Sequence, residues 1–176
     1  MLFRTLLLTV LCLSGALYAQ EPVSWLINAH SHNDYAHARP LLDALDQGFC
    51  SIEADVFLKD DQLLVGHTED DLTPERTLEK LYLDPLRERV RANGGRVYPG
   101  GPEVTLLVDF KTDMHETWVK LDSVLKNYAD MLTIYRDTGI ERKAVSVIIS
   151  GNRPKQDVWA QKERLAAIDG RIPEFK

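Results

Sequence analysis

The stretch Phe49-Cys50-Ser51-Ile52-Glu53-Ala54-Asp55-Val56-Phe57-Leu58 decides the fold of this chain. Its apolar and β-branched residues, which begin after Gly48, predict a buried β-strand. Because side chains alternate along a strand, Glu53 and Asp55 share one face. Burying two unpaired carboxylates costs on the order of several kcal/mol, and a bound cation would offset that cost. An edge strand with a solvated polar face is the alternative, and this stretch alone leaves both interpretations open.

Strands and helices alternate on both sides of this stretch. The sequence predicts further strands over residues 23–29, 63–67, 104–111 and 143–150, with a fifth strand of the main sheet beginning near 167–171. It predicts helices over residues 39–48, 77–92, 117–135 and 157–167, the second of them kinked or split at Pro85. This alternation indicates an α/β fold with a parallel sheet and right-handed crossovers.

Polar residues collect where the predicted strands end. His30 follows the first strand, Glu53 and Asp55 lie in the second, and Asp109 and Lys111 lie in the third. A (β/α)8 barrel and an open doubly wound sheet both place their active sites at these ends. The absence of a Gly-rich phosphate loop after the first strand disfavours dinucleotide binding.

The length of the chain is short for a complete barrel, which needs about 250 residues. We therefore expect residues 21–176 to be the amino-terminal part of a longer barrel, truncated after about four to five βα units. Residues 1–20 are predicted to be a secretory signal peptide, with Arg4, an apolar run and small residues that permit cleavage after Ala16 or Ala19. A signal peptide predicts that the protein is secreted or periplasmic. The minor alternative is that this segment is not cleaved and anchors the protein in the membrane.

Charge and cysteine content exclude several classes of partner. Without the leader, the chain has 20 basic and 27 acidic residues, a net charge of 20 − 27 = −7. This charge argues against nucleic acid or an anionic membrane surface as the main partner. Cys50 then remains as the only thiol, so no intramolecular disulfide can form. No second hydrophobic run is long enough to span a membrane.

The arrangement of these motifs resembles one enzyme superfamily, that of glycerophosphodiester phosphodiesterases, phosphatidylinositol-specific phospholipases C and spider-venom sphingomyelinase D. The resemblance covers about Leu26 to Ser150. The Asp109-x-Lys111 spacing is similar to that of the sphingomyelinase D strand. Residues 29–35 (AHSHNDY) and 150–154 (SGNRP) resemble the secreted or mitochondrial-inheritance-type branch. The fold that this resemblance implies is a TIM (β/α)8 barrel.

The resemblance also implies a role for each site residue. Glu53, Asp55 and Asp109 would bind one divalent cation, either Mg²⁺ or Ca²⁺, because oxygen donors suit these hard ions. His30 and His67 would be the acid/base pair, and Lys111 would face the phosphate. Substrate contacts are expected from His32, Asn33 and Arg153, and the implied substrate is a small-molecule or lipid phosphodiester. His32 could instead orient its loop or replace His30, Asn33 could structure the loop, and Arg153 could be a solvated charge.

Two departures from the glycerophosphodiesterase pattern leave other functions open. Ser31 and His32 stand where an arginine and a glycine usually follow the first histidine, and Asp109 replaces the usual glutamate. His30-Ser31-His32 also resembles the His-x-His of amidohydrolase and polymerase-histidinol-phosphatase barrels, which bind zinc or several metals. A secreted barrel without catalytic activity is the non-enzymatic alternative.

Overall fold

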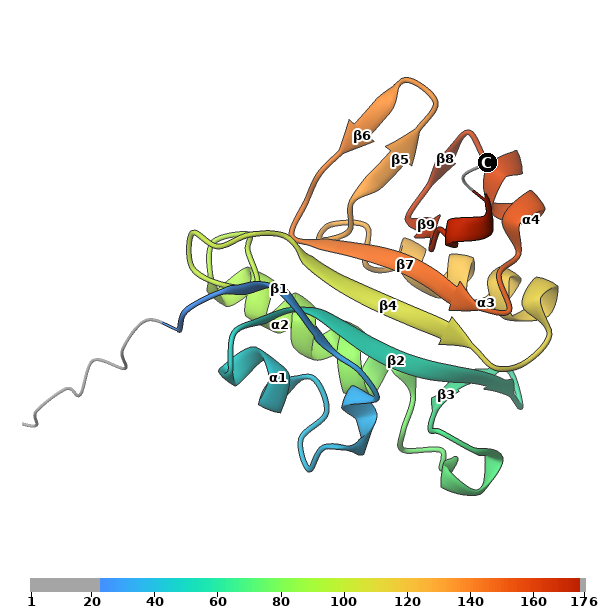
Figure 1. Cartoon of the computed structure of the whole chain (residues 1–176), viewed down its shortest axis with the longest axis horizontal. Helices are drawn as coiled ribbons and strands as arrows, with labels where there is room; N and C mark the ends of the chain where they lie inside the picture. The colour runs from blue at the N-terminus through green and yellow to red at the C-terminus, as the bar shows by residue number, and fades with distance from the viewer. Residues whose placement is uncertain (1–22, 175–176) are drawn as a thin grey trace, which may run out of the picture.

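The computed structural model describes residues 23–174, an α/β fold built around a six-stranded, mostly parallel sheet (Figure 1). The predicted signal peptide, residues 1–20, lies outside the described residues. The main sheet has the order β1-β2-β4-β7-β9, and β3 pairs antiparallel with the end of β2. The strand bounds are β1 Leu26–Ser31, β2 Phe49–Lys59, β3 Gln62–Val65, β4 Val104–Phe110, β7 Val145–Gly151 and β9 Ala166–Ile168. The predicted α/β class and parallel sheet are confirmed.

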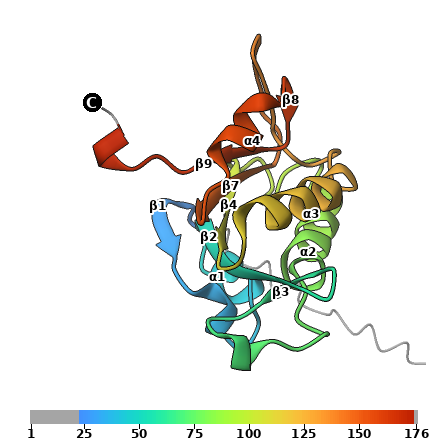
Figure 2. The ribbon, with the colours of Figure 1, turned by 90° about the vertical axis from the view of Figure 1, so that its right-hand side faces the viewer.

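Helices cover one face of this sheet. Figure 2 shows α2 and α3 on the same side of it. The α-helices are α1 Leu42–Asp46, α2 Asp84–Ala92, α3 Met114–Lys126 and α4 Lys155–Ala160. Short 3₁₀ helices are η1 Asp34–Ala36, η2 Glu69–Asp71 and η4 Ile172–Glu174, and η3 Glu79–Leu83 is a π-helix. No helix within residues 23–174 combines the length and the apolar character that a membrane crossing requires.

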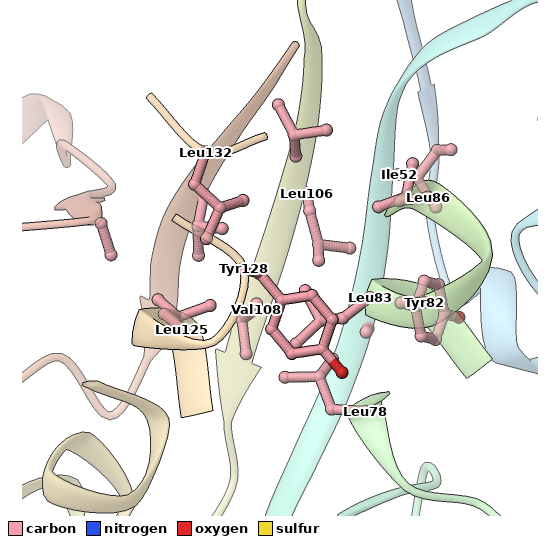
Figure 3. Packing of buried hydrophobic residues seen from close by; sticks show 14 of the residues in the cluster. Ile52, Leu78, Tyr82, Leu83, Leu86, Leu106, Val108, Leu125, Tyr128 and Leu132 are labelled. Carbon is pink, nitrogen blue, oxygen red and sulfur yellow. The ribbon is translucent and has the colours of Figure 1, made fainter. Parts of the chain in front are cut away.

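The main hydrophobic core lies between the sheet and α2 and α3. Ile52 on β2 and Leu106 and Val108 on β4 point into it, and the helices contribute Leu83, Leu86 and Leu125 (Figure 3). Burial alternates strictly along β4, so its other face carries half-buried residues that include Asp109. The core thus fixes which side chains point to the opposite face, where the carboxylates lie.

The edge-strand interpretation of the central stretch is wrong. β2 lies between β1 and β4, and Glu53 and Asp55 are only 6% and 1% exposed. The sheet formed by residues 23–174 nevertheless has two ends, at β1 and at β9, so these residues do not form a closed barrel.

The predicted helix over residues 117–135 is too long. The helix α3 ends at Lys126, although apolar residues continue at helical spacing beyond it. Residues 131–133 instead hydrogen-bond to Val145, which draws the chain to the start of β7. A hairpin of β5 Ile134–Arg136 and β6 Gly139–Glu141 follows and pairs with β8 Glu163–Arg164.

Other predicted bounds also differ from those of the structure. The helix predicted over residues 157–167 ends at Ala160, because Ala166–Ile168 pairs in parallel with β7 and forms the predicted fifth strand of the main sheet as β9. The helix predicted over residues 77–92 is not split at Pro85: the π-helix η3 leads directly into α2, and Pro85 lies in the first turn of α2. β1 runs to Ser31 rather than ending at Ala29, so His30 lies within the strand.

Candidate metal centre

Three carboxylates from two neighbouring strands form the carboxylate cluster, defined here as Glu53, Asp55 and Asp109. The parallel register places Asp55 beside Asp109, and Glu53 precedes Asp55 by two residues on the same face of β2. One ligand oxygen from each side chain lies within 4.8 Å of the others. Oxygen donors from three carboxylates suit a hard divalent cation such as Mg²⁺ or Ca²⁺. The predicted ligand set is therefore brought together by the sheet.

The two oxygens of Asp55 have different surroundings. Oδ2 accepts a hydrogen bond from the Tyr35 hydroxyl at 2.7 Å and lies 3.1 Å from Lys111 Nζ. Oδ1 is buried and has no hydrogen-bond partner among the described residues. Leaving a buried carboxylate oxygen without a partner costs free energy. A cation bound by the carboxylate cluster would supply the missing partner.

Lys111 follows β4 and bridges two members of the carboxylate cluster. Its Nζ lies 2.8 Å from Asp109 Oδ1 and 3.1 Å from Asp55 Oδ2. Partial burial alone would lower the pKa of Lys111, but the hydrogen bonds to Asp109 and Asp55 outweigh burial, so the pKa lies above its ordinary value. The ammonium therefore stays charged and offsets part of the negative charge of the cluster.

The polar loop after β1 contacts Glu53 through backbone and side chain. The backbone N–H of Asn33 donates to Glu53 Oε2 at 2.8 Å, and His32 Nε2 lies 3.5 Å from the same oxygen. Asn33 adopts the left-handed conformation, with φ of 51°. The loop thus orients one cluster ligand directly.

Asp34 holds this loop in place and is fully buried. Its carboxylate accepts hydrogen bonds from Ser31 Oγ at 3.0 Å, the Tyr82 hydroxyl at 3.0 Å and the Leu41 backbone N–H at 2.5 Å. A buried carboxylate with three donors is well satisfied. Asp34 is therefore a structural residue of the loop.

The histidines lie at different distances from the carboxylate cluster. His67 Nδ1 lies 3.0 Å from the Tyr35 hydroxyl and 3.5 Å from Asp55 Oδ2. His30 instead lies 2.8 Å from Ser51 Oγ through its Nδ1 atom. Within residues 23–174, only His32 and His67 have a ring nitrogen within 4.0 Å of a cluster oxygen. The structure therefore brings His67 and His32 to the carboxylates and pairs His30 with Ser51 instead.

Arg153, a predicted phosphate contact, is engaged elsewhere. Its guanidinium donates to Glu174 at 2.8 Å and to the Asp169 carbonyl, and its side chain is only 5% exposed. Hydrogen bonds from Arg153 and Lys155 lower the pKa of Glu174 to about 2. The arginine thus binds the segment after β9 in this structure.

The sequence did not single out Tyr35, although its hydroxyl contacts Asp55, Asn33 and His67. Burial and the hydrogen bond to Asp55 raise the pKa of Tyr35, so the hydroxyl stays protonated. Its place within the polar run 29–35 was the available signal, but an aromatic residue in a loop does not reveal which groups its hydroxyl reaches.

Because Gly151 has no side chain, the Asp109 carboxylate can lie against its backbone. Its φ is +65°, and a Cβ there would lie 2.5 Å from the Phe110 carbonyl oxygen and closer still to Asp109 Oδ1. We expect Gly151→Ala to displace Asp109, lower cation affinity at least about tenfold and lower the free energy of unfolding by about 1–3 kcal/mol. Cation titration and urea unfolding measure the two effects.

Gly100→Ala is the matched control for this substitution. Gly100 also has φ of +65°, but no atom lies within 4 Å of the Cβ position. The Gly100→Ala variant has the same backbone strain without a collision, so its cation affinity should equal that of the wild type. Equal cation affinity in the two variants would contradict the positioning of Asp109 by Gly151.

Comparison with known proteins gives one consistent family. Altered inheritance of mitochondria protein 6 homolog from Arthroderma benhamiae is 32% identical over 171 residues, covering 85% of this chain and 54% of that protein. Altered inheritance of mitochondria protein 6 from Saccharomyces cerevisiae is 40% identical over 146 residues, covering 71% of this chain and 37% of that protein. The Lachancea thermotolerans protein of the same name is 41% identical, with 71% and 34% covered.

The chain thus spans about a third to a half of the length of these relatives. No solved structure matches it significantly. Residues 23–168, which include the whole carboxylate cluster, Lys111 and His67, match the family model described as the AIM6-like phosphodiesterase domain. This chain therefore belongs to the AIM6-like phosphodiesterase domain family.

Proposed function

We propose that this protein is a cation-dependent phosphoric diester hydrolase that acts on a glycerophosphodiester or phospholipid-type substrate. The observation that carries the proposal is the carboxylate cluster, with the unpartnered Asp55 Oδ1 at its centre and Lys111 and His67 beside it. Membership of a phosphodiesterase domain family supports the same reaction class. The similarity to the wider phospholipase C-like superfamily supports the choice of substrate.

The residues of the site divide the chemistry between them. Glu53, Asp55 and Asp109 would hold the cation, which when bound supplies positive charge to a phosphodiester oxygen. Lys111 adds a second positive charge at the same place. His67 takes a proton from the attacking hydroxyl group or water and returns one to the leaving oxygen. For a second proton-transfer group, the family resemblance supports His30, and the 3.5 Å distance to Glu53 supports His32.

We also propose that the described sheet is part of a (β/α)8 barrel of the phospholipase C-like type. Leu107 and Ile148 support this, because they are apolar, half-buried and on the sheet face opposite the helices, where a barrel interior would cover them. Export through a leader at residues 1–20 would place the enzyme outside the cytoplasm. An in-frame continuation that encodes further βα units would support the barrel.

The zinc-hydrolase alternative finds less support. Among the described residues, the one group of three or more potential metal ligands contains carboxylates and no histidine. Zinc sites in hydrolases are rich in histidine. A non-catalytic secreted barrel would leave the unpartnered Asp55 oxygen and the neighbouring His67 without a use.

A hydrolysis panel tests the proposal. The protein is assayed with bis(p-nitrophenyl) phosphate, glycerophosphodiesters and lysophospholipids, in Mg²⁺ or Ca²⁺ and in EDTA. Turnover that depends on one of these cations and disappears in EDTA is the expected result. Tightly held zinc with histidine ligation, or no turnover of any diester with either cation, would overturn it.

Lys111→Met separates cation binding from catalysis. Removal of a positive charge that lies within 3.1 Å of two cluster carboxylates should tighten cation binding about tenfold. The same change should lower hydrolysis about a hundredfold, because the charge near the phosphate is lost. Calorimetric titration measures the cation affinity, and initial rates at saturating cation measure the hydrolysis.

Lys120→Met is the matched control, since Lys120 pairs with Asp61 outside the cluster. Parallel losses of binding and rate in Lys111→Met would contradict this division.

A further inference from the structure

The Tyr35 hydroxyl lies at the meeting point of three polar groups of the candidate site. It is 2.7 Å from Asp55 Oδ2, 2.8 Å from Asn33 Oδ1 and 3.0 Å from His67 Nδ1. Tyr35 itself is only 5% exposed and belongs to η1, which the buried Asp34 anchors. The hydroxyl is therefore held in one place, and its single proton can point to only one of three neighbours.

The neighbours decide where that proton points. A carboxylate only accepts hydrogen bonds, so an O···O distance of 2.7 Å between Tyr35 and Asp55 requires the hydroxyl proton between them. The Asn33 amide carries an acceptor oxygen and an NH₂ donor, and with the NH₂ group toward Tyr35 it would itself donate to the hydroxyl. Even if the proton pointed to Asn33, none would remain for His67.

His67 must then supply the proton of its own hydrogen bond. With the Tyr35 oxygen acting as acceptor, His67 Nδ1 is the donor, and in the neutral ring the other nitrogen, Nε2, carries the lone pair. The ring is 64% exposed, so Nε2 is accessible to a substrate. The Tyr35 and His67 rings are 21° from parallel, with centroids 6.4 Å apart.

We infer that Tyr35 is a positioning residue that holds His67 in the Nδ1–H tautomer, so that Nε2 is the atom that accepts and returns the proton during hydrolysis. The catalytic half of this inference rests on the proposed function; the tautomer half does not. Through Asp55, the same hydroxyl links the orientation of a cluster ligand to that of the histidine.

Nitrogen-15 NMR of the His67 ring tests the tautomer without any activity measurement. In the wild-type protein, at a pH where the ring is neutral, Nδ1 should be protonated and Nε2 should not. Tyr35→Phe keeps the buried ring and removes the hydroxyl, so Nδ1–H loses its acceptor and the population should shift toward Nε2–H. An Nε2–H tautomer in the wild type, or an unchanged tautomer in Tyr35→Phe, would overturn the inference.

Kinetics test the consequence for catalysis in the same two proteins. For a diester that the wild type hydrolyses, Tyr35→Phe should lower kcat about tenfold to a hundredfold, within the range of general acid–base contributions, with KM nearly unchanged. An unchanged kcat together with a shifted tautomer would overturn the positioning role in catalysis. If the wild type hydrolyses no diester, the proposed function fails, and the NMR result still decides the tautomer.

Tyr98→Phe is the matched control. Tyr98 is 2% exposed and its hydroxyl donates to the carbonyls of Leu45 and Phe49, at the start of β2 and away from the carboxylate cluster. This variant also loses one buried hydroxyl, so it reports the general cost of such a loss. The His67 tautomer and kcat should match those of the wild type.

Discussion

Asp55→Asn is expected to abolish cation binding and to lower hydrolysis about a thousandfold or more. The substitution keeps the size of the side chain but removes the negative charge of the carboxylate. Oδ1 of this carboxylate has no hydrogen-bond partner among the described residues. A catalytic cation contributes several kcal/mol to transition-state stabilisation, and each 1.36 kcal/mol corresponds to about tenfold in rate. Glu53→Gln should have the same effect. Isothermal titration with Mg²⁺ and Ca²⁺, together with initial rates, measures both losses.

Asp137→Asn is the control for these variants, because Asp137 is exposed in the turn between β5 and β6. It changes the net charge equally and should leave binding and rate unaltered. Circular dichroism establishes that all three variants fold. Wild-type turnover in Asp55→Asn or Glu53→Gln would refute the cation-dependent mechanism.

His67→Ala is expected to lower hydrolysis about a hundredfold to ten-thousandfold while cation binding stays within about twofold of the wild type. General acid–base catalysis by a side chain contributes about this much. The binding should persist because His67 lies near Asp55 but is not one of the three cluster ligands. Rates at saturating cation and a cation titration separate the two quantities.

His37→Ala is the corresponding control, since His37 is exposed and has no ring nitrogen near a cluster carboxylate. It should hydrolyse substrate at the wild-type rate. A His67→Ala variant that loses cation affinity in proportion to its rate would assign His67 a role in metal binding instead.

Alternation along strands made the carboxylate cluster predictable. Glu53 and Asp55 interrupt an otherwise apolar strand, and Asp109 does the same in a second strand that ends at the same edge of the sheet. Parallel pairing then has to bring the three side chains together. Local sequence therefore contained most of the information on the carboxylate cluster.

Long-range pairing limited the prediction of the rest. The apolar residues around Tyr128 and Leu132 keep helical spacing, but hydrogen bonds to Val145 end the helical path there. No local pattern states that residues 131–133 meet β7. The partners of Tyr35 and Arg153 were hidden for the same reason, because Asp55, His67 and Glu174 lie 20 or more residues away in sequence.

The pairing of Asp55 with Asp109 across β2 and β4 also bears on how the chain folds. If one strand slipped by a single residue, its carboxylates would turn toward the helices and away from those of its neighbour. A cation that requires all three carboxylates would therefore bind only the correctly aligned strands. Binding would stabilise that alignment by about 2.7 kcal/mol at a cation concentration one hundred times Kd. The ion would thus act as a selector of strand alignment during folding, before it takes part in any reaction.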